Sequence, residues 1–169
     1  MLSAHDALCE DIVSRYRLKQ NTHDATMLMI QKYVVQNLKY IGDDISKCAV
    51  EYWQLPFETI EFKNGDCEDG ALLIAALAIH AGIPAFRVRV TAGMVQEAPT
   101  APQGGHAYVS YLRESDNQWV VIDWCYLEDS KIPMERKTLL SKNPYYKEVW
   151  FSFNHLHSWS NKSFEFSTF

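Results

Sequence analysis

The sequence predicts an α+β fold in which a central buried helix packs on a small antiparallel sheet. Apolar residues recur at three- and four-residue steps through the first half of the chain, which is typical of helices. From about residue 86 onward, apolar and polar residues alternate in short segments separated by polar turns, which is typical of strands. Helices followed by antiparallel strands make an α+β domain.

Three helical segments are expected before residue 56. The first runs from about His5 to Tyr16. The second runs from Asp24 to Tyr40 and is ended by Gly42, because an apolar stripe follows helical spacing there. The stripe consists of Met27, Ile30, Val34, Leu38 and Ile41. A further helical stretch covers Ser46 to Trp53, and Pro56 is expected to close it.

The next helix gives the clearest pattern. Its body, Gly70 to Ala81, is nearly all Ala, Leu and Ile, so we expect it to be buried on every side in the middle of the domain. Asp66 is a natural N-cap and Asp69 follows three residues later. Gly82 and Pro84 end the helix.

Four strands are predicted in the second half. Phe86 to Val90 alternates with arginines, which marks a strand. His106 to Leu112 and Gln118 to Trp124 are expected to form a hairpin through the polar turn Arg113 to Asn117. Val149 to Phe153 is expected to be the last strand.

Length and composition favour one domain over residues 1–169, because 47% hydrophobic and 13% aromatic residues can build a sizeable core. The formal net charge of −5 comes from acids and bases mixed along the chain, so no nucleic-acid partner is expected. The basic residues from Lys131 to Lys147, Lys137 among them, are interpreted as a solvated face. The oligomeric state stays open.

The start of the chain, Met1 to Val13, lacks the basic and apolar segments of a secretory signal. The longest apolar run, Ala71 to Ile79, is too short to span a bilayer. We therefore expect a cytoplasmic protein without a membrane partner. Its four cysteines form no CxxC pair and are interpreted as reduced thiols.

Three residues suggest nucleophilic catalysis. Cys67 is the first residue of the buried helix, where the helix dipole is expected to lower the pKa of its thiol. His106 begins one strand of the hairpin and Asp123 ends the other, so the two side chains are expected to lie side by side. Each residue alone is more often structural. Together they supply a nucleophile, a base and an orienting acceptor.

The segment Gly65 to Ala71 reads Gly-Asp-Cys-Glu-Asp-Gly-Ala, and the apolar helix and Gly82-Ile83-Pro84 follow it. This arrangement resembles the nucleophile motif of the transglutaminase-like superfamily. It is especially similar to the bacterial transglutaminase-like cysteine peptidases, whose aromatic, Pro and Glu-Thr segment resembles Tyr52 to Thr59. Gly105 to Val109 and Val121 to Asp123 are similar to the histidine and aspartate strands of the family.

The resemblance covers residues 24–124 and implies a single transglutaminase-like domain with the papain-like fold. The implied activity is that of a cysteine peptidase or amidase acting on a protein or peptide. Cys67 attacks an amide carbonyl, His106 shuttles the proton and Asp123 holds the imidazole, while water resolves the thioester. Two alternatives stay open, namely acyl transfer to amines and a non-catalytic binding or structural module.

An oxyanion hole is expected beside the backbone N–H of Cys67. By resemblance, its side-chain donor is Gln54, like the glutamine of papain-like enzymes, or Trp53, like the tryptophan of transglutaminases. The prediction favours Gln54 as the donor. For Trp53, the alternative to a donor role is that its side chain only packs in the core.

No cofactor is required, but calcium is a candidate. Asp66, Glu68 and Asp69 surround the nucleophile, and without neutralisation these carboxylates would raise the pKa of Cys67. Helix capping alone accounts for acids at these positions. The resemblance implies the alternative, because a similar Asp-Cys-Glu-Asp segment binds calcium in one group of these peptidases.

Overall fold

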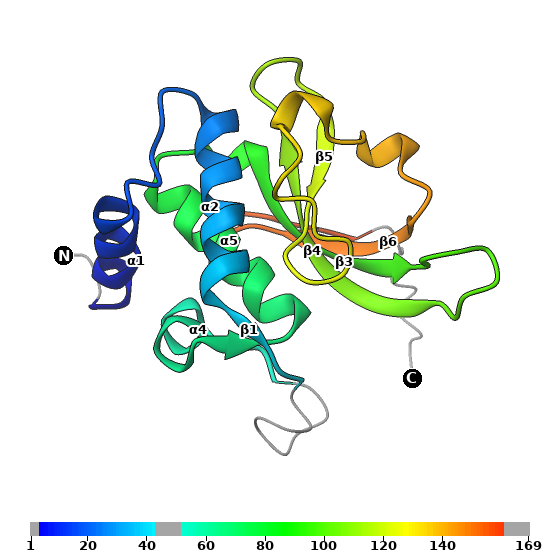
Figure 1. The fold of residues 1–169 in the computed structure, drawn as a ribbon, viewed down its shortest axis with the longest axis horizontal. Coiled ribbons are helices and arrows are strands. Elements are labelled where there is room, and N and C mark those ends of the chain that lie inside the picture. The colour runs from blue at the N-terminus through cyan, green and yellow to red at the C-terminus, as the bar shows by residue number, and fades with distance from the viewer. Residues whose placement is uncertain (1–3, 43–51, 161–169) are drawn as a thin grey trace, which may run out of the picture.

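The structure is a computed structural model that describes residues 4–42 and 52–160. It confirms the α+β prediction, with helices gathered at one side of a five-stranded sheet (Figure 1). Most of the helix expected from Ser46 to Trp53 lies outside the described residues.

The first two helices form close to where the sequence predicts them. Helix α1 spans Ala4–Arg15. Helix α2 spans His23–Asn37 and is capped by Thr22, whose side chain accepts a hydrogen bond from the Ala25 N–H. The prediction that α2 continues to Tyr40 is wrong, because the backbone becomes extended at Leu38.

Two short strands explain where α2 stops. Strand β1, Lys39–Tyr40, pairs in parallel with β2, Asn64–Gly65. The pairing places Tyr40 opposite Gly65, two residues before Cys67. The chain after α2 therefore lies directly beside the segment that leads into the candidate nucleophile.

Pro56 begins a helix, and residues 52–55 before it are not helical. Helix α4 spans Pro56–Phe62, and proline fits its first turn because the N–H groups there have no acceptor within the helix. Glu58 accepts a hydrogen bond from the Leu55 N–H at 2.8 Å, which closes the start of the helix. The helix ends at Lys63, which has a left-handed backbone with φ of 54°.

Helix α5, Cys67–His80, is the central helix that the sequence predicts. It packs against α1 and α2 on one side and against the sheet on the other (Figure 1). The main hydrophobic core includes fully buried side chains from three of these layers, such as Met27, Ile74 and Val109. Burial of this apolar helix fixes its first residue next to the sheet.

The sheet has the strand order β5-β4-β3-β6-β7 and is antiparallel throughout. The expected hairpin forms between β4 and β5, with Val109 opposite Ile122. The strands are β3 (Val88–Val95), β4 (Gly104–Leu112), β5 (Trp119–Ile122), β6 (Tyr146–Phe153) and β7 (Ser158–Ser160).

Two strand predictions need correction. The strand expected from Phe86 begins at Val88, because Ala85–Arg87 forms a 3₁₀ turn that leaves Phe86 exposed. The strand expected to be last begins earlier, at Tyr146, and β7 follows it. Further 3₁₀ turns span Met134–Arg136 and Leu140–Lys142.

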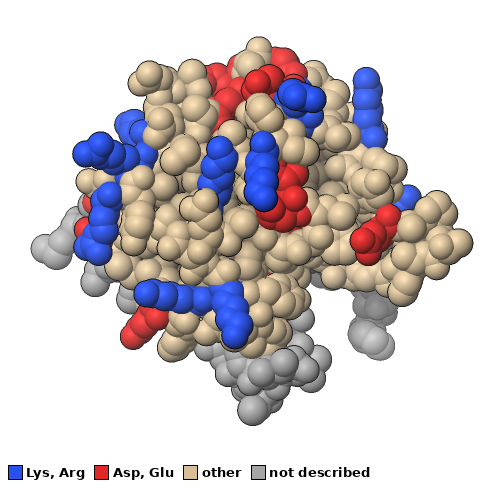
Figure 2. Space-filling view, viewed as in Figure 1, with Lys and Arg blue, Asp and Glu red and all other residues tan. Residues whose placement is uncertain are grey.

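The molecular surface carries charges of both signs. On the face shown in Figure 2, Lys and Arg side chains are spread over the surface, and acidic groups lie beside some of them. Across the described residues, every helix is too short or too polar to cross a membrane. The expected absence of a nucleic-acid partner stays a prediction.

Candidate active site

The start of α5 is built by a reciprocal cap. Asp66 is the N-cap residue, as predicted, and forms a capping box with Asp69. The Asp66 N–H donates to Oδ2 of Asp69 at 3.2 Å. This cap fixes the first helical turn and leaves Cys67 half-buried as its first residue.

The thiol of Cys67 lies between a donor and an acceptor. The Ala107 backbone N–H faces the sulfur, and the thiol donates a hydrogen bond to Oε2 of Glu68 at 3.1 Å. Burial raises the pKa of the Cys67 thiol well above its ordinary value, and Glu68 and Asp66 raise it further, while Ala107 lowers it. The net direction is therefore opposite to the lowering expected from the helix start, because burial and the neighbouring carboxylates raise this pKa.

His106 and Asp123 meet as the hairpin prediction requires. Nε2 of His106 lies 2.6 Å from Oδ2 of Asp123, and both side chains are buried. Oδ1 of Asp123 accepts hydrogen bonds from the backbone N–H groups of Cys125 at 3.1 Å and Tyr126 at 3.3 Å. The carboxylate is thus held by backbone on one oxygen and presented to the imidazole on the other.

Tyr146 is a member of this site that the sequence did not indicate. Its hydroxyl, from β6, donates to Oδ2 of Asp123 at 2.7 Å. Burial alone would raise the pKa of Asp123, but the bonds from His106, Tyr146 and the Cys125 N–H outweigh it and lower that pKa. Asp123 is therefore held as a carboxylate.

The imidazole of His106 is enclosed by aromatic rings. Its centroid lies 5.1 Å from that of Tyr126, 6.2 Å from Tyr108 and 6.4 Å from Tyr146. Because Nε2 faces Asp123, Nδ1 is the ring nitrogen left to exchange a proton with a reacting group. Ala107, the next residue along β4, faces the Cys67 sulfur, so the start of β4 brings the histidine and cysteine segments together.

Trp124 is a second residue that the sequence analysis missed. Its indole Nε1 donates to the backbone carbonyl of Cys67 at 3.3 Å. The ring lies so close to α5 that a Cβ on Gly70 would be 2.1 Å from Nε1. Tyr40, 56% exposed, packs against the same ring with centroids 5.9 Å apart. A glycine in the first turn of an otherwise apolar helix was the available signal.

Gln54, the expected oxyanion donor, donates its side-chain N–H groups to other residues of the protein. Its Nε2 donates to Oδ2 of Asp69 at 2.5 Å and to the carbonyl of Asn64 at 3.2 Å. Its backbone N–H donates to Oδ1 of Asp69 at 2.7 Å. Gln54 is fully buried, so both amide hydrogens hold the nucleophile segment in place rather than face a substrate.

Trp53, the other candidate donor, packs its ring against β6. The ring centroids lie 6.5 Å from Phe151 and 6.1 Å from Phe153. These contacts explain the aromatic side chain by packing, and its role as a donor stays a prediction.

The three expected calcium ligands are not equivalent. One ligand atom from each of Asp66, Cys67 and Glu68 lies within 4.8 Å of the others, and the two carboxylates suit a hard cation. Asp69 is 0% exposed, and both its oxygens accept hydrogen bonds from Gln54 or Asp66. Asp66 and Glu68 therefore place carboxylates together beside the thiol, whereas both oxygens of Asp69 are used by the helix cap and by Gln54.

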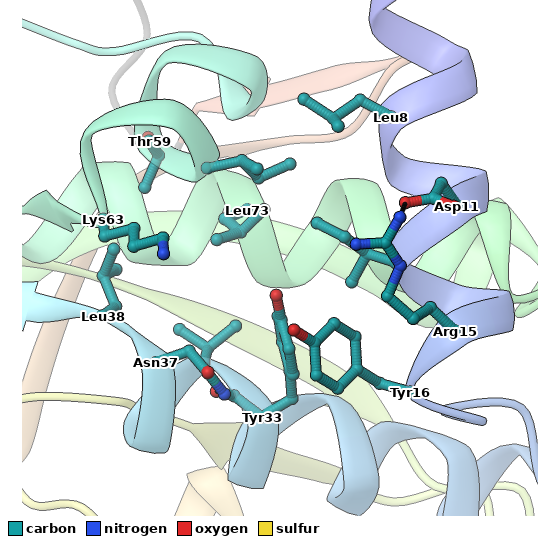
Figure 3. A pocket seen from close by; sticks show the side chains of 13 residues that line it. Leu8, Asp11, Arg15, Tyr16, Tyr33, Asn37, Leu38, Thr59, Lys63 and Leu73 are labelled. Carbon is teal, nitrogen blue, oxygen red and sulfur yellow. Dashed lines mark hydrogen bonds and ion pairs between the residues drawn. The ribbon is translucent and has the colours of Figure 1, made fainter.

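Cavities of the described residues lie outside this site, and two of them adjoin the helices. One, of about 220 Å³, opens between α1, α2 and α4, where Tyr16 and Tyr33 stand beside the Arg15–Asp11 ion pair (Figure 3). The other, of about 460 Å³, lies over the apolar side of α5 near Phe153. Cys67, His106 and Asp123 line neither cavity.

Comparison of the sequence with known families gives one match across most of the chain. A model described as the transglutaminase-like superfamily matches residues 10–124. The UPF0252 protein MJ1282 of Methanocaldococcus jannaschii is 30% identical over 113 residues, covering 64% of this chain and 31% of that protein. The chain thus spans about a third of the length of this relative.

Solved structures share the fold. Calcium-bound LapG from Legionella pneumophila matches with a TM-score of 0.67 at 22% identity, covering 94% of this chain and 77% of LapG. EGTA-treated LapG from the same organism matches with a TM-score of 0.67 at 19% identity, covering 93% of this chain and 86% of LapG. A protein from Cytophaga hutchinsonii, provisionally described as a cysteine protease, matches with a TM-score of 0.54 at 19% identity, covering 94% and 52%.

Proposed function

Because this chain belongs to the transglutaminase-like superfamily, we propose that it is a cysteine-nucleophile hydrolase that cleaves peptide or side-chain amides. The observation that carries the proposal is the buried pair of His106 and Asp123, joined at 2.6 Å next to the segment that faces Cys67. In the proposed triad, Cys67 would be the nucleophile, His106 its base and Asp123 the carboxylate that orients the imidazole.

In the proposed reaction, His106 takes the thiol proton of Cys67 through Nδ1 as the sulfur attacks the amide carbonyl. The same nitrogen returns the proton to the leaving amine, which gives a thioester. Water, deprotonated by His106, then attacks the thioester and releases the acid and the thiol. Asp123 holds the ring in one tautomer and stabilises its charged form.

The backbone N–H of Cys67 would be one oxyanion donor, because the first N–H groups of a helix have no acceptor within it. Asp66 and Glu68 would hold a calcium ion. A bound ion would supply positive charge that offsets the two carboxylates beside the thiol.

Covalent labelling of the nucleophile tests the proposal. A peptide library that carries an electrophile in place of the scissile amide should label Cys67, and mass spectrometry of the tryptic peptide identifies what is attached. Cys67→Ala and His106→Ala should each abolish labelling at residue 67, while Cys9→Ala, which removes a buried thiol in α1, should not. Labelling that survives His106→Ala would contradict the assigned base.

The acceptor is tested separately. We expect water to outcompete amines, so incubation with casein and a fluorescent primary amine should yield new chain ends or free acid and little fluorescence. Efficient amine incorporation without hydrolysis would favour the transglutaminase-type reaction. A correctly folded protein that gives neither product with any substrate class would favour a binding module.

A further inference from the structure

Lys137 is buried, contrary to the solvated face expected from its basic neighbourhood in the sequence. Its side chain is 0% exposed and forms an ion pair with the carboxylate of Asp129. Its Nζ also donates to the Asp129 backbone carbonyl at 3.0 Å. Burial lowers the pKa of Lys137, while Asp129 raises it. A charged pair in this position needs an explanation, because desolvation offsets most of its attraction.

Gln31 connects this pair to the candidate catalytic acid. Its Nε2 donates to Oδ1 of Asp129 at 2.9 Å and to the backbone carbonyl of Asp123 at 2.6 Å. Both neighbours are acceptors, so the amide nitrogen must face them and the orientation of the side chain is fixed. Gln31 is fully buried in α2, which makes it a bridge between the helix layer and the end of β5.

The amide oxygen of Gln31 is buried and has no hydrogen-bond partner among residues 4–42 and 52–160. An unsatisfied buried carbonyl costs stability, and an apolar residue of similar size would avoid that cost. Stability alone therefore does not explain a glutamine here. Its two donated hydrogen bonds, which hold the backbone of Asp123, supply another reason.

The loop that follows β5 depends on these contacts. Asp123 turns the chain by accepting the Cys125 and Tyr126 N–H groups on Oδ1, and it presents Oδ2 to His106. Its backbone carbonyl is held by Gln31 from the opposite layer. A shift of this backbone would move the carboxylate off the imidazole, because the side chain is short.

We propose that Gln31, Asp129 and Lys137 are positioning residues that hold the carboxylate of Asp123 on His106. The inference rests on the proposed function, since the placement of Asp123 matters to chemistry only if His106 activates Cys67. The three residues would act through Asp123, because Gln31 bonds to its backbone carbonyl and Asp129 links Gln31 to Lys137.

The test measures the alkylation rate of Cys67 by iodoacetamide at pH 7, resolved by peptide mapping, together with the melting temperature. Gln31→Met keeps the side-chain volume and removes both donors, so we expect alkylation to slow about tenfold. Gln36→Met, at an exposed glutamine on the same helix, should change neither quantity.

The decisive measurement repeats Gln31→Met in an Asp123→Ala background. A positioning role predicts no further slowing there, although the melting temperature still changes. Full additional slowing in that background would overturn the inference, as would a folded Gln31→Met protein with wild-type reactivity. If Asp123→Ala itself does not slow alkylation, both the triad and this inference fail.

A second variant covers the case in which Gln31→Met does not fold. Lys137→Met combined with Asp129→Asn removes both charges of the pair together and leaves no unpaired ion. It should slow alkylation in the wild-type background and have no effect on the rate in the Asp123→Ala background. Equal slowing in the two backgrounds would overturn the proposal.

Discussion

Trp124 donates its indole N–H to the backbone carbonyl of Cys67 at 3.3 Å, across 57 positions of sequence. Because Trp124 directly follows Asp123, one dipeptide both presents the carboxylate to His106 and fixes the helix turn that carries the thiol. Asp123 and Trp124 therefore couple the position of the candidate catalytic carboxylate to the position of Cys67.

Gly70 makes this contact possible, and its replacement should break it. A Cβ at residue 70 would lie 2.1 Å from the indole nitrogen, so Gly70→Ala must displace either Trp124 or the start of α5. Overpacking of this kind costs about 1–3 kcal/mol of unfolding free energy. Urea denaturation and Cys67 alkylation measure the two effects. Gly104→Ala, where a Cβ meets nothing within 4 Å, is the matched control and should be neutral.

Tyr146→Phe should weaken the site without unfolding it. The change removes the hydroxyl that donates to Asp123 at 2.7 Å and keeps the ring that packs on Tyr108. A hydrogen bond to a charged group is worth about 2 kcal/mol, so we expect a comparable loss of stability and slower alkylation of Cys67. Tyr145→Phe, at the exposed neighbouring tyrosine, is the control. Equal behaviour of the two variants would argue against a role for the hydroxyl.

Asp123 also predicts how stability depends on pH. Its pKa in the folded protein lies below the ordinary value of 3.8, so the unfolded chain binds a proton more readily. The resulting stabilisation is fully present above that value and is lost as pH falls through the folded pKa. Unfolding free energies measured from pH 6 down to pH 3 should therefore fall less steeply for Asp123→Asn than for wild type. Parallel curves would contradict the assignment.

The sequence could predict the three candidate catalytic residues because each follows from local signals. Cys67 begins an apolar helix with an acidic cap, and a short polar turn sets the hairpin that joins His106 to Asp123. Tyr146 could not be found in this way, because its contact depends on how β6 pairs with β3 in the sheet. The role of Gln31 could not be predicted either, because its position on a helix face does not indicate a hydrogen-bond partner 92 positions away.

The sequence predicted the wrong local structure where a residue is compatible with more than one conformation or environment. A proline can follow the end of one helix or occupy the first turn of the next, and Pro56 occupies the first turn of α4. The end of α2 was placed too late because its apolar stripe continues past Asn37, while pairing with β2 pulls the chain into an extended form. Lys137 was expected at the surface because its sequence neighbours are basic and polar, but its side chain is buried and pairs with Asp129.

Glu68 should restrain the nucleophile in protein without calcium. It accepts the hydrogen bond of the Cys67 thiol and, after burial, is a leading cause of the raised pKa of that thiol. Glu68→Gln removes the negative charge and keeps the side-chain length, so the thiol pKa should fall and alkylation at pH 7 should accelerate. Glu61→Gln, at an exposed position in α4, is the control. Slower alkylation in Glu68→Gln would show that the carboxylate assists the thiol instead.

Calcium should stabilise the protein through Asp66 and Glu68. Their oxygens lie within the 4.8 Å cluster at the start of α5, whereas Asp69 is used by the helix cap. A ligand that binds only the folded state at a hundred times its dissociation constant adds about 2.7 kcal/mol, so millimolar calcium should raise the melting temperature above that in EGTA. Asp66→Asn should reduce this shift, and Glu68→Gln should nearly abolish it, because each removes one anionic ligand.

Glu61→Gln should keep the full shift, since that residue lies outside the cluster. Identical melts in EGTA and calcium, for protein shown to be metal-free, would leave helix capping as the sufficient reason for acids around Cys67.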